Sequence, residues 1–298
     1  MNHISNLKKS RDRLTILILL ITVICSIAPL ITKGMLAQKS MITAFGEEIQ
    51  FYGKGLYARN SFSMAIQAIA QDMVNLILVV PLTVISLISC KKEKMIAQFT
   101  LTGLLGYLLY TYMSYAFLMF YNSFFLLYVI NMALSFYAFV ISILILNEHP
   151  VIEKLEDNMK TKGLRIFLNL TGLFIAMMWL GRIIPTIGTD LAPAGLENYS
   201  TLGIQVLDLG VIVPACFVIS HLLKVKSRLG YIFAPVLIIK AVALVIAVLT
   251  MAVCMTLSGV EVAPVEYIVF GIVCIFAVFY LVRILAQMKH ISEGNADC

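Results

Sequence analysis

Eight long runs of apolar residues divide this chain, and they constrain its fold more than any other feature of the sequence. A run of about 20 apolar residues is long enough to cross the hydrocarbon core of a bilayer as one helix. Backbone polar groups inside a bilayer must pair within the protein, so each run predicts a helix rather than an open strand. The predicted spans cover residues 14–32, 73–90, 97–118, 124–146, 165–184, 201–223, 231–256 and 264–286.

The composition agrees with a membrane location. Hydrophobic residues make up 61% of the 298 residues and charged residues only 13%, against about 45–50% and about 25% in soluble domains. We therefore predict an all-α polytopic integral membrane protein, with residues 1–298 forming a single bundle of about eight transmembrane helices. No repeat at a fixed period and no inverted symmetry between the two halves is visible in the sequence.

The basic residues are distributed unevenly between the two sides of the predicted bundle. Lys and Arg are concentrated in the N-terminus, in every second loop, including the long loop 147–164, and in the C-terminus. The positive-inside rule places these segments, and so both termini, in the cytoplasm of an inner cell membrane. The net charge of +6 follows from this topology, and we expect no nucleic-acid partner. The other segments, including the outer loop 33–72, hold only Lys33, Lys39, Lys54, Arg59 and Arg182.

Two charged residues lie inside predicted spans, where an unpaired charge is energetically costly. Asp208 is in the sixth span and Lys240 in the seventh, at similar predicted depths on helices that a short loop joins. We expect an ion pair between them, because pairing keeps both groups charged. One interpretation is a structural clamp between the two helices. The other is an ion or proton relay, or a site that holds a polar ligand.

Polar residues recur at helical spacing on three other spans. One interpretation is hydrogen bonding between neighbouring helices, and the other is the wall of a vestibule or pocket that opens to the outside. The tyrosines that lie deep in these spans need hydrogen-bond partners. Neighbouring helices can supply them, or the tyrosines can line a pocket. The residues expected to line the approach from outside to Asp208 and Lys240 are Gln71, Asp72, Asn75, Tyr110, Ser114, Tyr128, Asn131 and Gln205.

Signatures of catalysis and of metal binding are absent from the sequence. There is no H-E-x-x-H zinc motif, no G-x-S-x-G nucleophile elbow, no phosphate-binding loop and no dinucleotide fingerprint. The four histidines are scattered, and none of the six cysteines forms a C-x-x-C pair. We therefore predict no cofactor, no metal site and no catalytic residues, and we favour a non-enzymatic role over an enzymatic one.

Three segments together resemble a group of uncharacterised prokaryotic multispanning membrane proteins. They are Gln-Asp-Met-Val-Asn-Leu at 71–76, Tyr-Thr-Tyr-Met-Ser-Tyr-Ala-Phe at 110–117 followed by Tyr-Asn at 121–122, and Gln-x-x-Asp-Leu-Gly-x-x-Val-Pro at 205–214. The similarity extends from the second predicted span through the seventh. The group has no assigned reaction, so the resemblance implies a bacterial or archaeal cytoplasmic membrane and no functional residues.

The leading hypothesis is binding or transport of a small polar solute or ion through an outward-facing polar cavity centred on Asp208 and Lys240. The alternative is a non-catalytic scaffold, or a subunit of a larger membrane complex with a protein partner. A lipid-modifying membrane enzyme is third, although no nucleophile and base can be named for it. The lipid bilayer is an expected partner under all three hypotheses.

Overall fold

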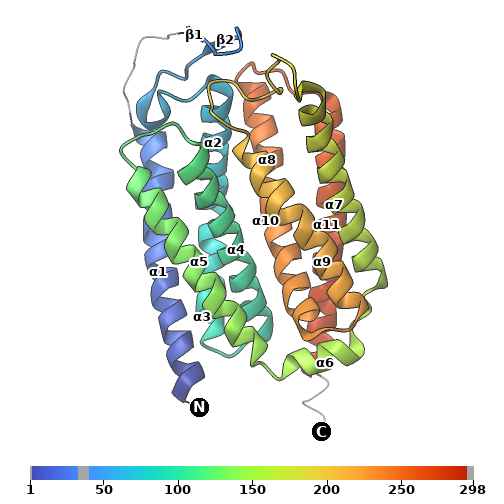
Figure 1. Ribbon diagram of the computed structural model, residues 1–298. Coiled ribbons are helices and arrows are strands. Elements are labelled where there is room, and N and C mark those ends of the chain that lie inside the picture. The colour runs from blue at the N-terminus through green and yellow to red at the C-terminus, as the bar shows by residue number, and fades with distance from the viewer. Residues whose placement is uncertain (1, 33–39, 294–298) are drawn as a thin grey trace.

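The computed structural model describes residues 2–32 and 40–293, which form a bundle of long, roughly antiparallel helices (Figure 1). Residues 33–39 of the predicted outer loop, and residues 294–298, lie outside the described part. The first half of the chain forms α1 (Asn2–Ile31), β1 (Ser40–Ile42), β2 (Glu48–Gln50), a 3-10 turn (Gly55–Tyr57), α2 (Phe62–Val74), a π-helical segment (Asn75–Val79), α3 (Val80–Cys90), α4 (Met95–Leu118) and α5 (Phe125–Asn147).

A short helix, α6, crosses one end of the bundle and leads into the second half (Figure 1). The elements from α6 onward are α6 (Val151–Asn158), α7 (Lys162–Ile183), a 3-10 turn (Ile184–Thr186), α8 (Gly203–Leu207), a π-helical segment (Asp208–Ile212), α9 (Val213–Lys224), α10 (Arg228–Leu257) and α11 (Pro264–Glu293).

Seven helical segments of the described chain are long and apolar enough to cross a membrane, so this is an all-α membrane protein. Each corresponds to one of the eight predicted spans. The remaining predicted span is α4, which has 24 residues but is less apolar, because glutamine, threonine and tyrosine interrupt it. These polar residues are possible in α4 because most of that helix is buried among the others.

The two halves have the same helix order, which the sequence comparison did not reveal. Four helical segments (α1, α2–α3, α4 and α5) lie beside four more (α7, α8–α9, α10 and α11) in Figure 1. The second of these in each half contains a π-helical segment followed directly by Val-Pro, at Pro81 and Pro214. Proline has no N–H and crowds the carbonyl four residues before it, so the preceding turn widens. Asn75 and Asp208 are the first residues of these two segments.

The connection between α1 and α2 contains a small structured unit that the sequence analysis did not anticipate. Strands β1 and β2 pair antiparallel, with Met41 opposite Ile49. The chain then returns to α2, where the Ser61 hydroxyl accepts a hydrogen bond from the Met64 amide at 3.3 Å and caps the helix. The helix that begins there continues without a break through the π-helical segment to Cys90.

The halves meet where α4 packs against α10, the two most enclosed helices. Gly103 makes this close approach possible. A Cβ atom there would lie 3.1 Å from the Val236 carbonyl oxygen and would collide with the Ile239 side chain. Small residues allow helix backbones to approach closely in membranes. We call the contact between the two halves the seam.

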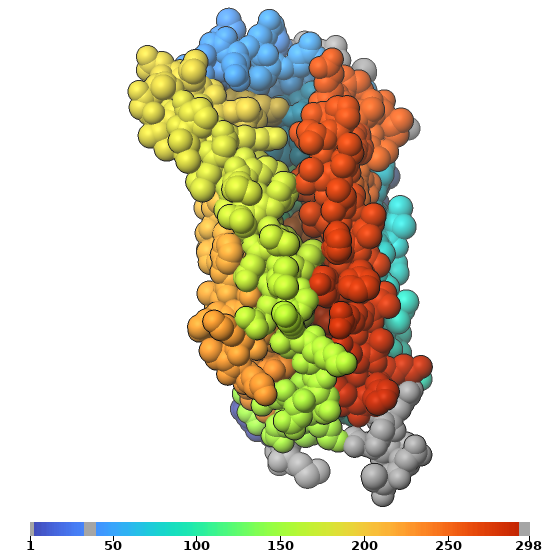
Figure 2. Space-filling model, turned by 90° about the vertical axis from the view of Figure 1, so that its right-hand side faces the viewer, coloured from blue at the N-terminus to red at the C-terminus, as the bar shows by residue number. Residues whose placement is uncertain are grey.

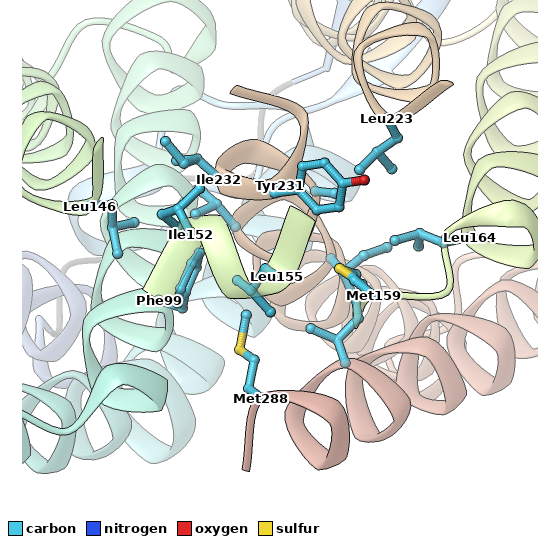
Figure 3. Close-up of a cluster of buried hydrophobic side chains, with 14 of the residues drawn as sticks. Phe99, Leu146, Ile152, Leu155, Met159, Leu164, Leu223, Tyr231, Ile232 and Met288 are labelled. Atoms are coloured by element: carbon cyan, nitrogen blue, oxygen red, sulfur yellow. The ribbon is translucent and has the colours of Figure 1, made fainter. Parts of the chain in front are cut away.

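Helix α6 closes one end of the bundle with its apolar face (Figure 3). Ile152 and Leu155 are fully buried, in a cluster that draws Phe99 from α4, Tyr231 from α10 and other side chains from both halves. The sequence analysis placed this segment as part of a cytoplasmic loop. Glu153 and Asp157 are exposed, but the buried face makes α6 part of the core.

Helix α1 begins well before the predicted span at residue 14. Arg11 belongs to the basic N-terminal segment, yet it is only 1% exposed. Its guanidinium donates to the Asp12 carboxylate at 2.8 Å and to the Gln98 side-chain oxygen on α4. These two acceptors make burial of the arginine possible.

Candidate functional site: a cavity along the seam between the halves

A cavity of about 530 Å³ lies between the halves, and its wall comes from α2, α4, α7, α8, α10 and α11. Its volume is typical of small-molecule sites. Leu168 and Ile238 belong both to this wall and to the cluster beneath α6, so packed side chains close that end. At the opposite end the wall includes the loop residues Gly195, Glu197 and Glu261. The cavity therefore extends toward the loops on the side away from α6.

Asp208 lies on this wall at the start of the second π-helical segment. Its carboxylate accepts two hydrogen bonds, one at each oxygen. The Tyr110 hydroxyl of α4 donates to Oδ1 at 2.7 Å, and the Trp179 indole N–H of α7 donates to Oδ2 at 2.8 Å. Three helices are thereby joined at one carboxylate, and hydrogen bonds to a carboxylate stabilise its charged form.

Lys240 lies near the middle of α10, 12 residues after Arg228, or about 18 Å along the helix axis. Its side chain is 9% exposed and borders the cavity. The ammonium lies 4.2 Å from the centroid of the Tyr110 ring, a cation–π contact. Among the described residues, no carboxylate or hydrogen-bond acceptor contacts this ammonium.

The expected direct ion pair is therefore replaced by a bridged arrangement. No salt bridge within 4.0 Å joins Asp208 to Lys240 in the described chain. The reason is Tyr110, whose hydroxyl bonds the carboxylate while its ring receives the ammonium. Both charges border the same cavity and still attract one another at longer range.

The wall formed by α2 and α4 is polar above this centre. Gln71 is buried except toward the cavity, and its amide donates to the Tyr107 hydroxyl and, at 3.4 Å, to the Thr111 hydroxyl. Ser114 also borders the cavity and donates to the Tyr110 carbonyl at 3.0 Å. The side chains facing them from α7, α10 and α11 are mainly apolar, among them Phe174, Met178, Met251, Phe270 and Val273.

A second polar cluster lies within the first half and meets the cavity wall only at Tyr115 among the residues named below. Its centre is Asp72, which is fully buried. The Tyr57 hydroxyl donates to Oδ2 at 2.7 Å, and the Tyr115 hydroxyl contacts Oδ1 at 3.0 Å. No basic side chain forms a salt bridge with Asp72 in the part of the chain that is described.

Further polar groups surround this second cluster. The Asn131 amide donates to the Thr22 hydroxyl at 3.0 Å, joining α5 to α1. The Tyr128 ring packs edge-on against Tyr115, with centroids 5.3 Å apart. The Tyr128 hydroxyl, the Ser135 hydroxyl and the Asn131 side-chain oxygen are buried without a hydrogen-bond partner. Such groups are costly in a dry interior.

The structure thus divides the ten residues singled out from the sequence. Five of them border the cavity: Asp208, Lys240, Gln71, Tyr110 and Ser114. Gln205 lies on α8 away from the cavity wall. Asn75 is buried beside Tyr107, whose hydroxyl donates to its side-chain oxygen at 3.2 Å. Asp72, Tyr128 and Asn131 were expected to line the vestibule, but they belong to the second polar cluster, which we call the closed cluster.

Two important residues were not assigned to either site from the sequence. Trp179 is the only tryptophan in the chain, and a signal did exist, since a buried indole N–H needs an acceptor. Tyr57 comes from the outer loop and reaches the buried carboxylate of Asp72. No sequence pattern we know indicates that a loop tyrosine penetrates this far.

The residues that line the cavity show which groups it can offer to another molecule. The described residues contain no group of three or more His, Cys, Asp or Glu side chains that could hold a metal ion. The cavity offers a cationic donor, aromatic faces and hydroxyl and amide groups on one wall, and an apolar surface on the other. No protein-family model, curated protein or solved structure matches the chain.

Proposed function

We propose that this protein binds a small molecule in the cavity along the seam and takes part in its movement across or within the membrane. One observation carries the proposal. Lys240, buried midway along a membrane helix, presents an ammonium without a hydrogen-bond acceptor to a cavity of about 530 Å³. An intramembrane charge is costly unless it is paired or used, and a ligand acceptor supplies the missing partner.

The proposal includes a topology. Helix α4 is the eighth span, and α6 lies on the cytoplasmic side with both termini. The first turns of α1 and the last turns of α11 lie at the same end as α6 (Figure 1), as an even number of crossings requires. The uneven distribution of Lys and Arg supports this orientation. On the resemblance described above, the membrane is the cytoplasmic membrane of a bacterium or archaeon.

Cysteine accessibility tests whether the cavity opens away from α6. In a variant without native cysteines, Ser114→Cys places a thiol on the cavity wall, and Ser135→Cys places one in the closed cluster. A membrane-impermeant maleimide added to intact cells should label Ser114→Cys and leave Ser135→Cys unlabelled. Labelling of Ser114→Cys only in inside-out vesicles would reverse the topology and retain the cavity.

Native mass spectrometry tests the binding itself. We expect a small molecule to co-purify with the full-length protein and to be lost from Lys240→Met. The matched control is Lys224→Met, which removes a lysine at the end of α9, away from the cavity. A protein that carries no ligand and whose Ser114→Cys thiol cannot be labelled from either side would favour the scaffold function instead.

A further inference from the structure

We infer that the ligand is an amphiphilic anion, a carboxylate or phosphate headgroup on a long apolar chain, with the headgroup at Lys240 and the chain passing between α7 and α11 into the bilayer. This inference rests on the proposed function, because it names the chemical class of the molecule that the cavity binds. It follows from the free donors of the site, from the two unlike walls, and from the separation of two helices.

The charge of the headgroup follows from which polar atoms are already engaged. Each carboxylate oxygen of Asp208 already accepts one hydrogen bond from the protein, so Asp208 is better satisfied than Lys240. The Lys240 ammonium has three N–H donors and contacts only the ring of Tyr110. An anionic oxygen is the partner that such donors favour.

A second basic residue lies at the other end of the cavity wall. Arg182 borders the cavity near the end of α7 and lies 5.3 Å above the Trp179 ring. Its only salt bridge among the described residues is a long one to Glu266, at 3.6 Å, and both side chains are about 40% exposed. An exposed pair of this kind contributes little energy, so Arg182 can exchange Glu266 for the anion of a ligand, in competition with Glu197 and Glu261 at the same end.

The two walls of the cavity differ in the way that an amphiphile requires. The wall of α2 and α4 presents Gln71, Thr111 and Ser114, which suit a hydrated headgroup. Beyond Lys240, the wall that α10 forms is apolar from Ala241 to Met255, a rise of about 21 Å along the helix. A small hydrated ion gains nothing by contact with an apolar wall of this length, whereas a hydrocarbon chain is stabilised there because its apolar surface leaves water.

The apolar wall has an opening toward the membrane. Helices α7 and α11 touch at only a few residues, whereas the corresponding pair in the first half, α1 and α5, packs along much of its length. Figure 2 shows α7 and α11 side by side on one face, with a hollow between them toward the end away from α6. The cavity wall includes residues from both helices on either side of this gap, such as Phe174 and Phe270.

The outer faces of these two helices are suited to lipid. Leu170 and Met177 on α7, and Ile272 and Ile275 on α11, are exposed apolar side chains. In a bilayer these faces contact hydrocarbon, so a chain that leaves the cavity between them remains in apolar surroundings. A headgroup at Lys240 then lies near the middle of the membrane, a position that a lipid occupies only while it crosses.

Fluorescence of the single tryptophan tests the inference directly, because Trp179 is part of the cavity wall. The full-length protein in detergent is titrated with dibromostearate, whose bromines quench tryptophan on contact. We expect saturable quenching that excess stearate or lysophosphatidate relieves and that acetate, inorganic phosphate and stearylamine do not. The more effective of the two lipid competitors identifies the headgroup as carboxylate or phosphate.

Variants and a cationic probe complete the test. Lys240→Met should weaken binding of dibromostearate about tenfold or more, the change expected on losing one charge-assisted hydrogen bond. Lys240→Arg should restore most of it, and Lys224→Met should leave it unchanged. Equal quenching of the wild-type protein by dibromostearylamine would overturn the assignment of an anionic headgroup without relying on any variant.

Two other outcomes separate this inference from the proposed function. Relief of quenching by acetate or inorganic phosphate would show that the site takes a small anion, which overturns the amphiphile and leaves the binding function intact. Absence of saturable quenching, together with a Ser114→Cys thiol that cannot be labelled, would overturn both.

Discussion

The two halves of this protein share one helix order and use it in opposite ways. In the first half, α1 and α5 pack together, and a fully buried Asp72 is enclosed by tyrosine hydroxyls. In the second half, α7 and α11 stand apart, and Asp208 borders a cavity. The same architecture thus makes a closed polar cluster in one half and an open site in the other, and the separation of a single helix pair accounts for the difference.

The comparison also shows why polar residues in a membrane span are ambiguous. Asp72 and Asp208 are both acidic residues in apolar surroundings, and tyrosine hydroxyls contact both. They differ in whether the adjacent helices leave space for another molecule. Three pairs of matched variants test this difference, from the largest expected effect to the smallest, and a pH measurement at the junction of the halves follows them.

Truncating one isoleucine in each half should give the largest contrast. Ile18 on α1 is fully buried, and Ile175 on α7 faces the cavity. Ile18→Ala should lower the free energy of unfolding by about 2–5 kcal/mol, because it leaves a void. Ile175→Ala should lower it by less than about 1.5 kcal/mol, because it only enlarges an existing space. Unfolding in mixed micelles measures both, and equal losses would contradict the contrast.

Enlarging one alanine in each half is the complementary test. Ala138→Leu on α5 inserts atoms into a fully packed site and should destabilise the protein by about 1–3 kcal/mol. Ala241→Leu on α10 projects into the cavity and should change stability little. It should instead weaken quenching of Trp179 by dibromostearate. If Ala241→Leu proves as destabilising as Ala138→Leu, the cavity is not open in the folded protein.

Removing one tyrosine hydroxyl from each carboxylate gives a smaller contrast. Tyr115→Phe removes the hydrogen bond to Oδ1 of the fully buried Asp72 and should cost about 1–2 kcal/mol. Tyr110→Phe leaves an oxygen of Asp208 beside the cavity, where water replaces the hydroxyl, so less than about 1 kcal/mol is expected. Adding Asp72→Asn to Tyr115→Phe should recover part of the loss. No recovery would mean that the hydroxyl acts through packing instead.

The smallest effect concerns pH at the junction of the halves. His149 lies between α5 and α6, and its Nδ1 accepts a hydrogen bond from the Val151 amide at 3.3 Å. Burial, and then the nearby positive charge of Lys8, lower the pKa of His149 below its ordinary value of 6.5. The unfolded chain therefore binds a proton at a higher pH than the folded protein does. Stability is full above pH 6.5 and declines as the pH falls from there toward the lowered pKa.

His149→Gln checks this expectation. The variant should lose the part of the pH dependence that lies below pH 6.5, while at pH 8 any difference from the wild type reflects the hydrogen bond alone. Thermal unfolding measured across this range distinguishes the two contributions. An unchanged pH dependence would assign the acid sensitivity to other groups.

Much of the fold was predictable, because the apolar runs of membrane helices are long and distinctive. Asp208 and Lys240 were also recognisable, since a charge within an apolar run stands out. What hydropathy does not contain is the direction of each side chain. Gln71 and Asp72 are adjacent in sequence and point to different sides of α2, one to the cavity and one to the closed cluster.

The similarity of the two halves escaped the sequence for a related reason. The π-helical segments at Asn75 and Asp208 share only a short pattern that ends in Val-Pro, and the surrounding residues have adapted to different neighbours. The gap between α7 and α11 is a property of packing among several helices. No single run of residues encodes it.

Helix α6 limits how the molecule can change shape. Its buried face joins side chains of both halves in one cluster, so sliding or rocking of the halves at this end would separate a packed interior. Helix α6 therefore holds the two halves together at this end. Movement costs less at the opposite end, where α7 and α11 make few contacts and can tilt apart. Under the proposed function, access to Lys240 would then depend on this one helix pair rather than on an exchange of whole halves.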